Sequence, residues 1–169
     1  LAAKAGKAIF CEKPIDLSLE RVDQCLATVR KAGVTMMIGF NRRFDASFAA
    51  LHAGVHSGKI GKLETLIVTS RDPGPPPIGY IKVSGGLFRD MMIHDFDIVT
   101  WILGEMPTEV YATASNLVDP EIGKAGDIDT AMVVLKTKSG CIAQISNSRR
   151  AVYGYDQRIE AFGSKGMLQ

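Results

Sequence analysis

Several features that would assign a sequence to a specialised class are missing from these 169 residues. No apolar run approaches the roughly 20 residues that a membrane-spanning helix needs, so we expect a soluble protein without a membrane partner. The 20 basic and 18 acidic residues alternate along the chain and give a formal charge of +2, so nucleic acid is not an expected partner. The polar excess typical of disorder is absent as well, because 46% of the residues are hydrophobic and 22% are charged.

Cysteine is also scarce. Cys11, Cys25 and Cys141 are odd in number, widely spaced and without a Cys-x-x-Cys pair, which argues against a disulfide framework and a zinc site. We expect reduced thiols that serve as small core side chains, and hence a cytoplasmic protein. His52 and His56 are four residues apart, but no third ligand is near them, so we predict a partly exposed helix face and no metal site.

The sequence has neither a start methionine nor a signal peptide. Residues 1–7 are typical of the last turns of a helix that Gly6 ends, and a strand pattern follows. At the other end, Gly-Met-Leu-Gln follows a turn, where a next strand would begin. We therefore expect the chain to start and stop inside folded domains, as an internal piece of a longer protein.

The first forty residues alternate between strand and helix patterns. Apolar runs over 8–11 and 34–40 predict two strands, and the second run is continuous, as in a strand buried on both faces of a parallel sheet. Between them, Ser18 is a candidate N-cap and Gly33 a candidate stop signal for a helix. Its apolar residues recur at helical spacing: Leu19, Val22, Leu26 and Val29. These residues form one βαβ unit of a doubly wound fold.

The pattern changes after residue 40. Two helices are predicted, over 45–57 and 88–103, with a strand over 62–72 and a proline-rich loop over 73–79 between them. The buried side of the first of these helices is predicted to carry Phe44, Phe48, Leu51 and Val55. Strand patterns over 109–118, 129–138, 141–148 and 155–162 then predict an antiparallel meander. The fold class is therefore α/β plus α+β, with a mainly antiparallel open sheet in the second part.

Polar side chains follow both strands of the βαβ unit. Lys13, held by Pro14, ends the first strand, and Asn41, Arg42 and Arg43 follow the second. Ligands bind at the carboxyl ends of strands in such sheets, where an ammonium group can stabilise an alkoxide and amide or guanidinium groups can line a polyhydroxy substrate. The alternatives are a solvated lysine and an Arg43 that pairs with a carboxylate.

A second candidate site lies in the segment predicted as the helix over 88–103. Asp90 and His94 are four residues apart, so on one helix they share a face, close enough for the carboxylate to orient the imidazole. Met92, Phe96, Val99 and Leu103 fall on a different, apolar face. A purely structural His–Asp pair is the alternative.

Together, these segments resemble the Gfo/Idh/MocA family of oxidoreductases. The residues that carry the resemblance are Glu12-Lys13-Pro14, Gly39-Phe40-Asn41-Arg42-Arg43-Phe44-Asp45, Arg71-Asp72-Pro73, Lys82 to Asp90, His94-Asp95-Phe96-Asp97 and Tyr153-Gly154-Tyr155-Asp156. The resemblance implies that residues 1–40 are the C-terminal remnant of a Rossmann-like dinucleotide-binding domain. Residues 41–169 would form an α+β substrate and oligomerisation domain that is incomplete at its C-terminus.

The resemblance also implies an activity and roles for individual residues. The activity is NAD-dependent oxidation of a cyclic polyol carbinol, with myo-inositol to 2-keto-myo-inositol as the favoured reaction. His94 would be the general base, Asp90 would position it, and Lys13 would stabilise developing negative charge. Glu12 and Lys13 would contact the cofactor. Asn41, Arg42 and Tyr155 would line the polyol.

One departure from the family pattern is large. The glycine-rich dinucleotide fingerprint Gly-x-Gly-x-x-Gly occurs nowhere in the sequence, so we expect this piece to be inactive by itself and its longer parent to be the enzyme. Two alternatives remain open: a dehydrogenase of the same family that acts on another sugar or polyol, and a non-catalytic, sugar-sensing relative. The resemblance further implies a homo-oligomer, either a dimer or a tetramer.

Overall fold

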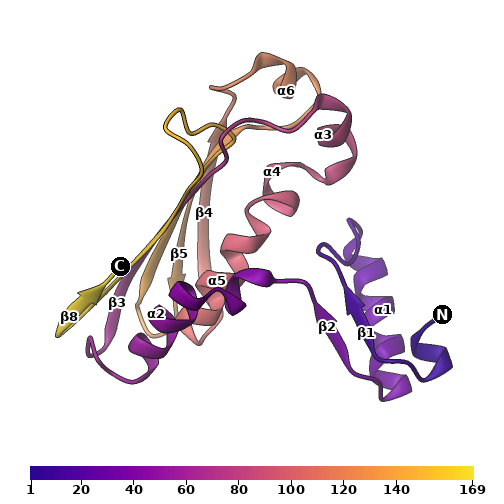
Figure 1. The fold of residues 1–169 in the computed structure, drawn as a ribbon, viewed down its shortest axis with the longest axis horizontal. Helices are drawn as coiled ribbons and strands as arrows, with labels where there is room; N and C mark the ends of the chain where they lie inside the picture. Colours follow the sequence, from indigo (N-terminus) through magenta and orange to yellow (C-terminus); the bar gives the residue numbers. More distant parts are fainter. The chain divides into compact units, whose positions relative to one another are not determined.

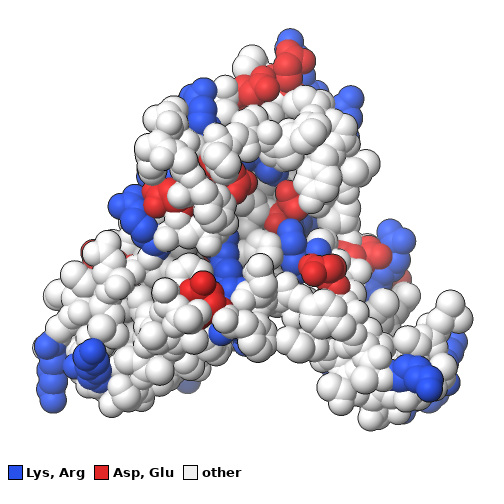
Figure 2. All heavy atoms as spheres, in the orientation of Figure 1, with Lys and Arg blue, Asp and Glu red and all other residues white.

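The computed structural model describes residues 1–169 and divides into two compact units, Leu1–Asn41 and Arg42–Gln169 (Figure 1). The first unit contains a parallel strand pair, and the second contains a six-stranded, mostly antiparallel sheet. The predicted combination of an α/β part with an α+β part is confirmed. On the face seen in Figure 2, basic and acidic side chains are interspersed, in line with the formal charge of +2.

The first unit is a single strand–helix–strand arrangement. It contains the 3-10 helix η1 (Ala3–Ala5), β1 (Ile9–Cys11), α1 (Leu19–Ala32) and β2 (Met36–Ile38). β1 and β2 pair in parallel, with Cys11 opposite Ile38. The predicted helix signals are confirmed, because Ser18 accepts a hydrogen bond from the Arg21 amide and Gly33 ends α1 with a φ of 64°.

The two faces of this strand pair are not equally covered. Phe10 and Met37 lie opposite each other and are 66% and 43% exposed, and Leu19 of α1 is 78% exposed. The prediction of a strand buried on both faces is therefore wrong for these residues, because α1, the one α-helix of this unit, covers a single face. Ile9 and Met36 point to the other side of the strands and help to line an open hollow of about 500 Å³.

The three cysteines are free thiols with different exposure. Cys141 is buried, Cys11 is half-buried and Cys25 is exposed. The prediction of core side chains is confirmed for Cys141. It is wrong for Cys25, because no residue of α1 is buried.

The second unit is a sheet with its main helices on one face. Its strands are β3 (Leu63–Arg71), β4 (Pro107–Ser115), β5 (Thr130–Thr137), β6 (Ile142–Ser148), β7 (Asp156–Gly163) and β8 (Gly166–Leu168). They are arranged in the order β4-β5-β6-β3-β7-β8. The helices α2 (Ala46–His56) and α5 (Ile93–Leu103) lie on one face of this sheet (Figure 1). The core between them includes Leu51, Leu66, Val68, Ile98, Val99, Ile102, Val133, Ile145 and Ile159.

The strand order differs from the predicted meander at one place. β5 and β6 pair antiparallel as predicted, but β3 lies between β6 and β7, parallel to β6 and antiparallel to β7. A period-two pattern marks each strand without specifying its neighbour, so no local signal marks this insertion. The consequence is one parallel pair, β3–β6, whose two carboxyl ends meet at the same edge of the sheet.

The helix predicted over 88–103 is broken. The structure has three helices in this region: α3 (Ile78–Ser84), α4 (Gly86–Asp90) and α5. The Leu87 carbonyl accepts hydrogen bonds from the amides of both Met91 and Met92, at 3.0 and 2.9 Å, which ends α4. Asp90 therefore ends one helix and His94 lies in the first turn of the next. The prediction that both lie on one face of a single helix is wrong.

The helix α2 begins at the predicted position, and Asp45 caps it, because the Asp45 carboxylate accepts two backbone amides. Leu51 and Val55 are buried as predicted, but Phe44 is 70% exposed. Phe44 belongs to a separate 3-10 turn, η2 (Asn41–Phe44), and so does not follow the periodicity of α2.

Two further observations concern the helices. A short helix, α6 (Pro120–Lys124), lies between β4 and β5 and was not predicted. None of the helices combines the length and the apolar character that a membrane crossing requires.

Candidate functional site

Charged side chains gather at the carboxyl end of the parallel pair β3–β6. Arg71 and Ser148 are the last partners of this pair, and Asp72 and Arg149 follow them directly. The Asp72 amide donates to the Ser148 carbonyl at 3.0 Å, which extends the pairing by one step. The strand insertion described above therefore places an acid and a base side by side at one edge of the sheet.

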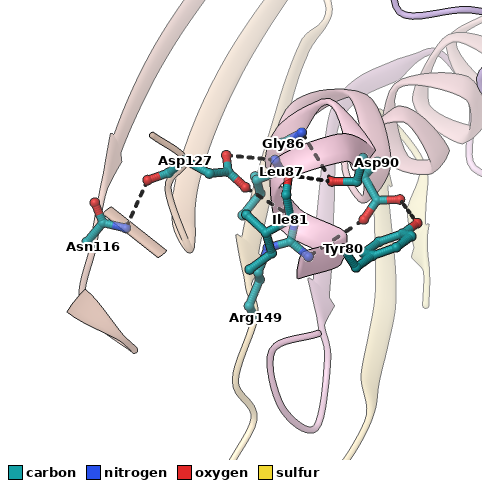
Figure 3. A network of polar contacts seen from close by, with 9 residues as sticks. Tyr80, Ile81, Gly86, Leu87, Asp90, Asn116, Asp127 and Arg149 are labelled. Carbon is teal, nitrogen blue, oxygen red and sulfur yellow. Dashed lines mark hydrogen bonds and ion pairs between the residues drawn. The ribbon is translucent and has the colours of Figure 1, made fainter. Parts of the chain in front are cut away.

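The carboxylate of Asp90 is held from two sides (Figure 3). The Tyr80 hydroxyl on α3 donates to its Oδ1 at 2.8 Å. Its Oδ2 lies 3.7 Å from Nη1 of Arg149. This hydrogen bond, together with burial, raises the pKa of Tyr80, so the hydroxyl keeps its proton in the role of a donor. Asp90, a predicted catalytic residue, thus has a defined orientation.

Arg149 is almost completely buried, with a side chain that is 1% exposed. Its Nη2 lies 3.5 Å from Oδ2 of Asp127. The other carboxylate oxygen of Asp127 accepts the Leu87 amide at 3.0 Å, at the start of α4. Asn116 in turn donates to the Asp127 carbonyl at 3.1 Å. Asp127, Arg149 and Asp90 therefore form one chain of charges around α4 (Figure 3).

A second polar cluster lies under the first turn of α5. Asp95 is fully buried and is paired with Arg42, whose Nη2 also donates to Ser70 at 3.1 Å. Asn147 of β6 donates to the second Asp95 oxygen at 2.9 Å. Burial raises the pKa of Asp95, while Arg42 and Asn147 oppose this shift by favouring the carboxylate. Arg42, predicted to line the polyol, is thus largely engaged in an internal pair, with a side chain that is 12% exposed.

Asp72 is within electrostatic reach of both clusters. Burial raises its pKa, the Asp90 and Asp95 carboxylates add to this shift, and the Arg149 and Arg42 guanidinium groups oppose it. Perturbed carboxylates surrounded by both signs of charge are typical of functional sites.

His94 is the second residue of α5, next to Asp95 in sequence. It is half-buried, its amide donates to the Met91 carbonyl at 3.3 Å, and its Nδ1 is buried. An imidazole at this position has one nitrogen inside the protein and the rest of the ring only partly covered. This is a suitable environment for a residue that exchanges a proton with a bound molecule.

The other predicted residues belong to other segments of the chain. Glu12 and Lys13 follow β1 in the first unit, and Asn41 is the last residue of that unit. Tyr155 precedes β7 and is 63% exposed. Its neighbour Tyr153 accepts from Arg71 at 2.8 Å and donates to Asp156 at 2.5 Å.

The strand ends of the first unit approach each other closely. The Gly39 amide donates to the Cys11 carbonyl at 2.8 Å. A Cβ atom on Gly39 would lie 3.0 Å from the Glu12 carboxylate, so a side chain here would require this carboxylate to shift. Lys13 follows at this edge and precedes Pro14 through a cis peptide bond.

Contacts in the structure engage three other residues that the sequence singled out. Arg43 forms a two-pronged ion pair with Asp97, at 2.8 and 2.5 Å, so its expected carboxylate partner is confirmed. His52 stacks on Trp101 with a centroid distance of 3.8 Å and an interplanar angle of 5°. His56 is exposed and lies against His52.

Sequence reasoning missed several members of the site. They are Tyr80, Asp127, Asn147 and Arg149, and the resemblance alone drew attention to Asp72 and Asp95. A buried arginine in a strand-rich segment has no local signature, because its partners are distant in sequence. A signal was available for Gly86, since consecutive glycines before a helix often mark a close backbone approach.

These features define a class of protein: a βαβ element followed by an α+β unit that has a held carboxylate at the end of α4 and a histidine at the start of α5. Residues 1–40 match the model for the oxidoreductase family with an NAD-binding Rossmann fold. Residues 48–169 match the GFO/IDH/MocA C-terminal domain. The chain belongs to the Gfo/Idh/MocA family, as its sequence predicted.

Similar proteins are inositol dehydrogenases. The chain is 60% identical to the myo-inositol 2-dehydrogenase of Thermotoga maritima and 59% identical to the inositol 2-dehydrogenase of Rhizobium meliloti, with 98% of this chain and 50% of each relative covered. It therefore spans about half the length of the curated relatives it matches.

Solved structures agree with this result. A myo-inositol dehydrogenase from Corynebacterium glutamicum superimposes with a TM-score of 0.94 at 48% identity, covering 99% of this chain and 50% of that one. The scyllo-inositol dehydrogenase of Lactobacillus casei, solved with NAD(H) and scyllo-inositol, gives a TM-score of 0.87 at 33% identity, covering 98% and 50%.

Proposed function

We propose that the protein is an NAD-dependent dehydrogenase that oxidises myo-inositol to 2-keto-myo-inositol. The observation that carries the proposal is the held carboxylate of Asp90 at the end of α4, immediately before the turn that leads into His94. The names of the relatives support inositol as the substrate class, because two of them with about the same identity act on inositol at position 2.

His94 is the proposed general base. Oxidation of a carbinol removes a hydride from carbon and a proton from the hydroxyl, and imidazole is the side chain whose ordinary pKa suits proton uptake near neutral pH. Asp90 keeps a negative charge close to the start of α5, which favours the protonated imidazole formed in this step.

NAD, when bound, supplies the acceptor for the hydride. The placement of its nicotinamide end beside Lys13 is supported by position, because Glu12 and Lys13 follow β1 and Gly39 follows β2 at the carboxyl ends of these parallel strands, where ligands bind in such sheets. Glu12 and Lys13 are the proposed cofactor contacts. Lys13 would also stabilise negative charge on the substrate oxygen, as a third catalytic residue.

Asn41, Arg42 and Tyr155 are the proposed polyol contacts. Tyr155 is well exposed and presents a hydroxyl that can reach a ligand. Arg42 already uses two groups on Asp95 and Ser70, so only its remaining N–H donors are available to a substrate.

The protein is also proposed to act as a homo-oligomer, either a dimer or a tetramer. The face of the sheet opposite the helices exposes an apolar surface formed by Ile67, Met132, Val134, Ile142 and Phe162, which are 39 to 47% exposed. Contiguous apolar surfaces of this kind are typical of protein interfaces. Light scattering would test this by measuring the mass in solution of the wild-type protein and of Val134→Glu, whose mass should be lower.

The three free thiols support a cytoplasmic location.

The deciding experiment is steady-state NAD reduction by the full-length protein with a panel of polyols. We expect turnover with myo-inositol and a lower kcat/KM with scyllo-inositol and with open-chain sugars. Highest activity on another sugar would reassign the substrate within the family. Sugar binding by calorimetry without any NAD reduction would identify a non-catalytic sensor and refute the dehydrogenase proposal.

A further inference from the structure

We propose that Arg149 is a positioning residue for Asp90, and that it shares its charge between Asp90 and Asp127. This inference rests on the proposed dehydrogenase function, because it concerns how Asp90 is prepared for its role beside His94. Arg149 has no role in the sequence-based interpretation. Three observations support a positioning role for Arg149: its side chain is buried, two carboxylates lie near it, and other groups hold both of those carboxylates in place.

The burial of Arg149 needs an explanation. A guanidinium group that is 1% exposed loses nearly all of its hydration, which is costly unless carboxylates compensate for it. Two carboxylates are near, Asp90 at 3.7 Å and Asp127 at 3.5 Å. Both distances exceed those of a charge-assisted hydrogen bond, and the Nε and Nη2 atoms of Arg149 make no hydrogen bond. The side chain therefore acts mainly through its charge.

A comparison with Arg43 supports this interpretation. Arg43 forms a close fork with Asp97, at 2.8 and 2.5 Å, which is the geometry of a structural ion pair. Arg149 instead lies between two carboxylates without closing a fork on either. A shared cation can stabilise both charges while neither carboxylate is fully neutralised.

All three residues of this chain of charges, Asp127, Arg149 and Asp90, are anchored by the backbone. The Arg149 amide donates to the Asp129 carbonyl at 2.9 Å. Asp127 is bonded to the first turn of α4 through the Leu87 amide, and Asp90 is the last residue of the same helix. Figure 3 shows the Arg149 side chain between these two carboxylates, with Tyr80 on the far side of Asp90. Arg149 therefore links the two ends of α4.

The chemical consequence concerns the charge of the site. The Arg149 guanidinium adds a positive charge to the site, and a positive charge opposes the uptake of a further proton nearby. Loss of this cation should therefore move the acid limb of the pH–rate profile to higher pH. Loss of the Asp127 charge should move the acid limb to lower pH, because the Arg149 charge then acts on Asp90 without a second carboxylate beside it.

The test uses the full-length protein and compares Arg149→Met, Arg149→Lys and Asp127→Asn with Arg150→Met, an exposed neighbour. We expect Arg149→Met to lower kcat by about 10- to 100-fold, since small displacements in a catalytic pair have effects of this size. Its KM should change much less, and its acid limb should move up. Arg149→Lys should return the limb to its wild-type position, and Arg150→Met should leave both kinetic constants unchanged.

Asp127→Asn keeps the inference testable if Arg149→Met does not fold, because asparagine can still accept the Leu87 amide. Its acid limb should move to lower pH. A limb that stays in place in both variants, with turnover per folded molecule preserved, would show that Arg149 is only structural. Failure of the wild-type protein to reduce NAD with any polyol would instead refute the proposed function, so the two failures are distinguishable.

Discussion

The Tyr80 hydroxyl donates a 2.8 Å hydrogen bond to Oδ1 of Asp90, which joins α3 to the last residue of α4. The bond spans the junction at Gly85 between these two helices. It leaves the other carboxylate oxygen directed at Arg149. The orientation of Asp90 is thus set by two side chains that are distant from each other in sequence.

We predict that Tyr80→Phe lowers kcat of the full-length protein by roughly 3- to 10-fold, because a hydrogen bond to a charged group contributes about 1.5–3 kcal/mol when buried and less here, where Tyr80 is 48% exposed. Tyr111→Phe, on an exposed residue of β4, is the matched control and should behave as wild type. Steady-state kinetics checks both. Unchanged kcat in Tyr80→Phe would mean that this bond does not serve Asp90.

We predict that His94→Ala lowers polyol oxidation by at least about 100-fold, since general bases typically contribute factors of 10² to 10⁴. The control is His56→Ala, an exposed histidine on α2, which should keep its turnover. Thermal midpoints of both variants separate loss of chemistry from loss of folded protein. Near-normal turnover of His94→Ala would remove His94 from the proposed mechanism.

The buried Arg42–Asp95 pair leads to a stability prediction. Arg42→Met leaves Asp95 buried without its cation and should cost about 3–5 kcal/mol of unfolding free energy. Arg43→Met breaks a pair whose arginine is 40% exposed and should cost roughly 1 kcal/mol or less. Urea unfolding of the two variants measures the difference. Equal losses would contradict the assignment of Arg42–Asp95 as the buried, coupled pair.

The raised pKa of Asp72 leads to a pH-dependent prediction. An acid whose pKa is raised by folding binds its proton more tightly in the folded state, so its ionisation costs stability as the pH rises through that pKa. The free energy of unfolding of Asp72→Asn should therefore exceed that of the wild type by on the order of 1 kcal/mol at neutral pH. The gain should disappear in acid, where Asp72 is protonated in both states.

Urea unfolding at several pH values tests the Asp72 prediction. Asp23→Asn, an exposed acid on α1, is the control and should stay within about 0.5 kcal/mol of wild type at every pH. A constant difference between Asp72→Asn and wild type, independent of pH, would rule out ionisation as its cause.

Gly86 is predicted to be intolerant of a side chain for two reasons. Its φ is 81°, and a Cβ atom would lie 2.6 Å from Oδ1 of Asp127. Gly140, with a φ of 93° and nothing within 4 Å, shares only the first reason. Gly140→Ala should lower the free energy of unfolding by about 1–2 kcal/mol, because alanine is strained in a left-handed backbone conformation. Gly86→Ala should cost more and should also lower kcat, because Asp127 must move. Identical effects of the two substitutions on unfolding and kcat would refute this.

Much of the local structure could be predicted because its signals are short-range. The Ser18 and Asp45 caps, the Gly33 stop and the βαβ order of the first unit each depend on neighbouring residues. The family could also be identified from motifs, and the matches of residues 1–40 and 48–169 to the two family models confirm it. The assigned roles of Lys13, Asp90 and His94 stay predictions, since they depend on chemistry that only kinetics can measure.

The contacts that define the site depend on the tertiary structure. β3 lies between β6 and β7, and this places Asp72 beside Arg149 at one sheet edge. The double acceptor at Leu87 separates Asp90 from His94 by a helix break. Residue periodicity specifies which side of an element faces the core, because that depends on spacing along the chain. It does not specify which strand is the neighbour or which buried charge is the partner, because these are set by packing among residues that are far apart in sequence.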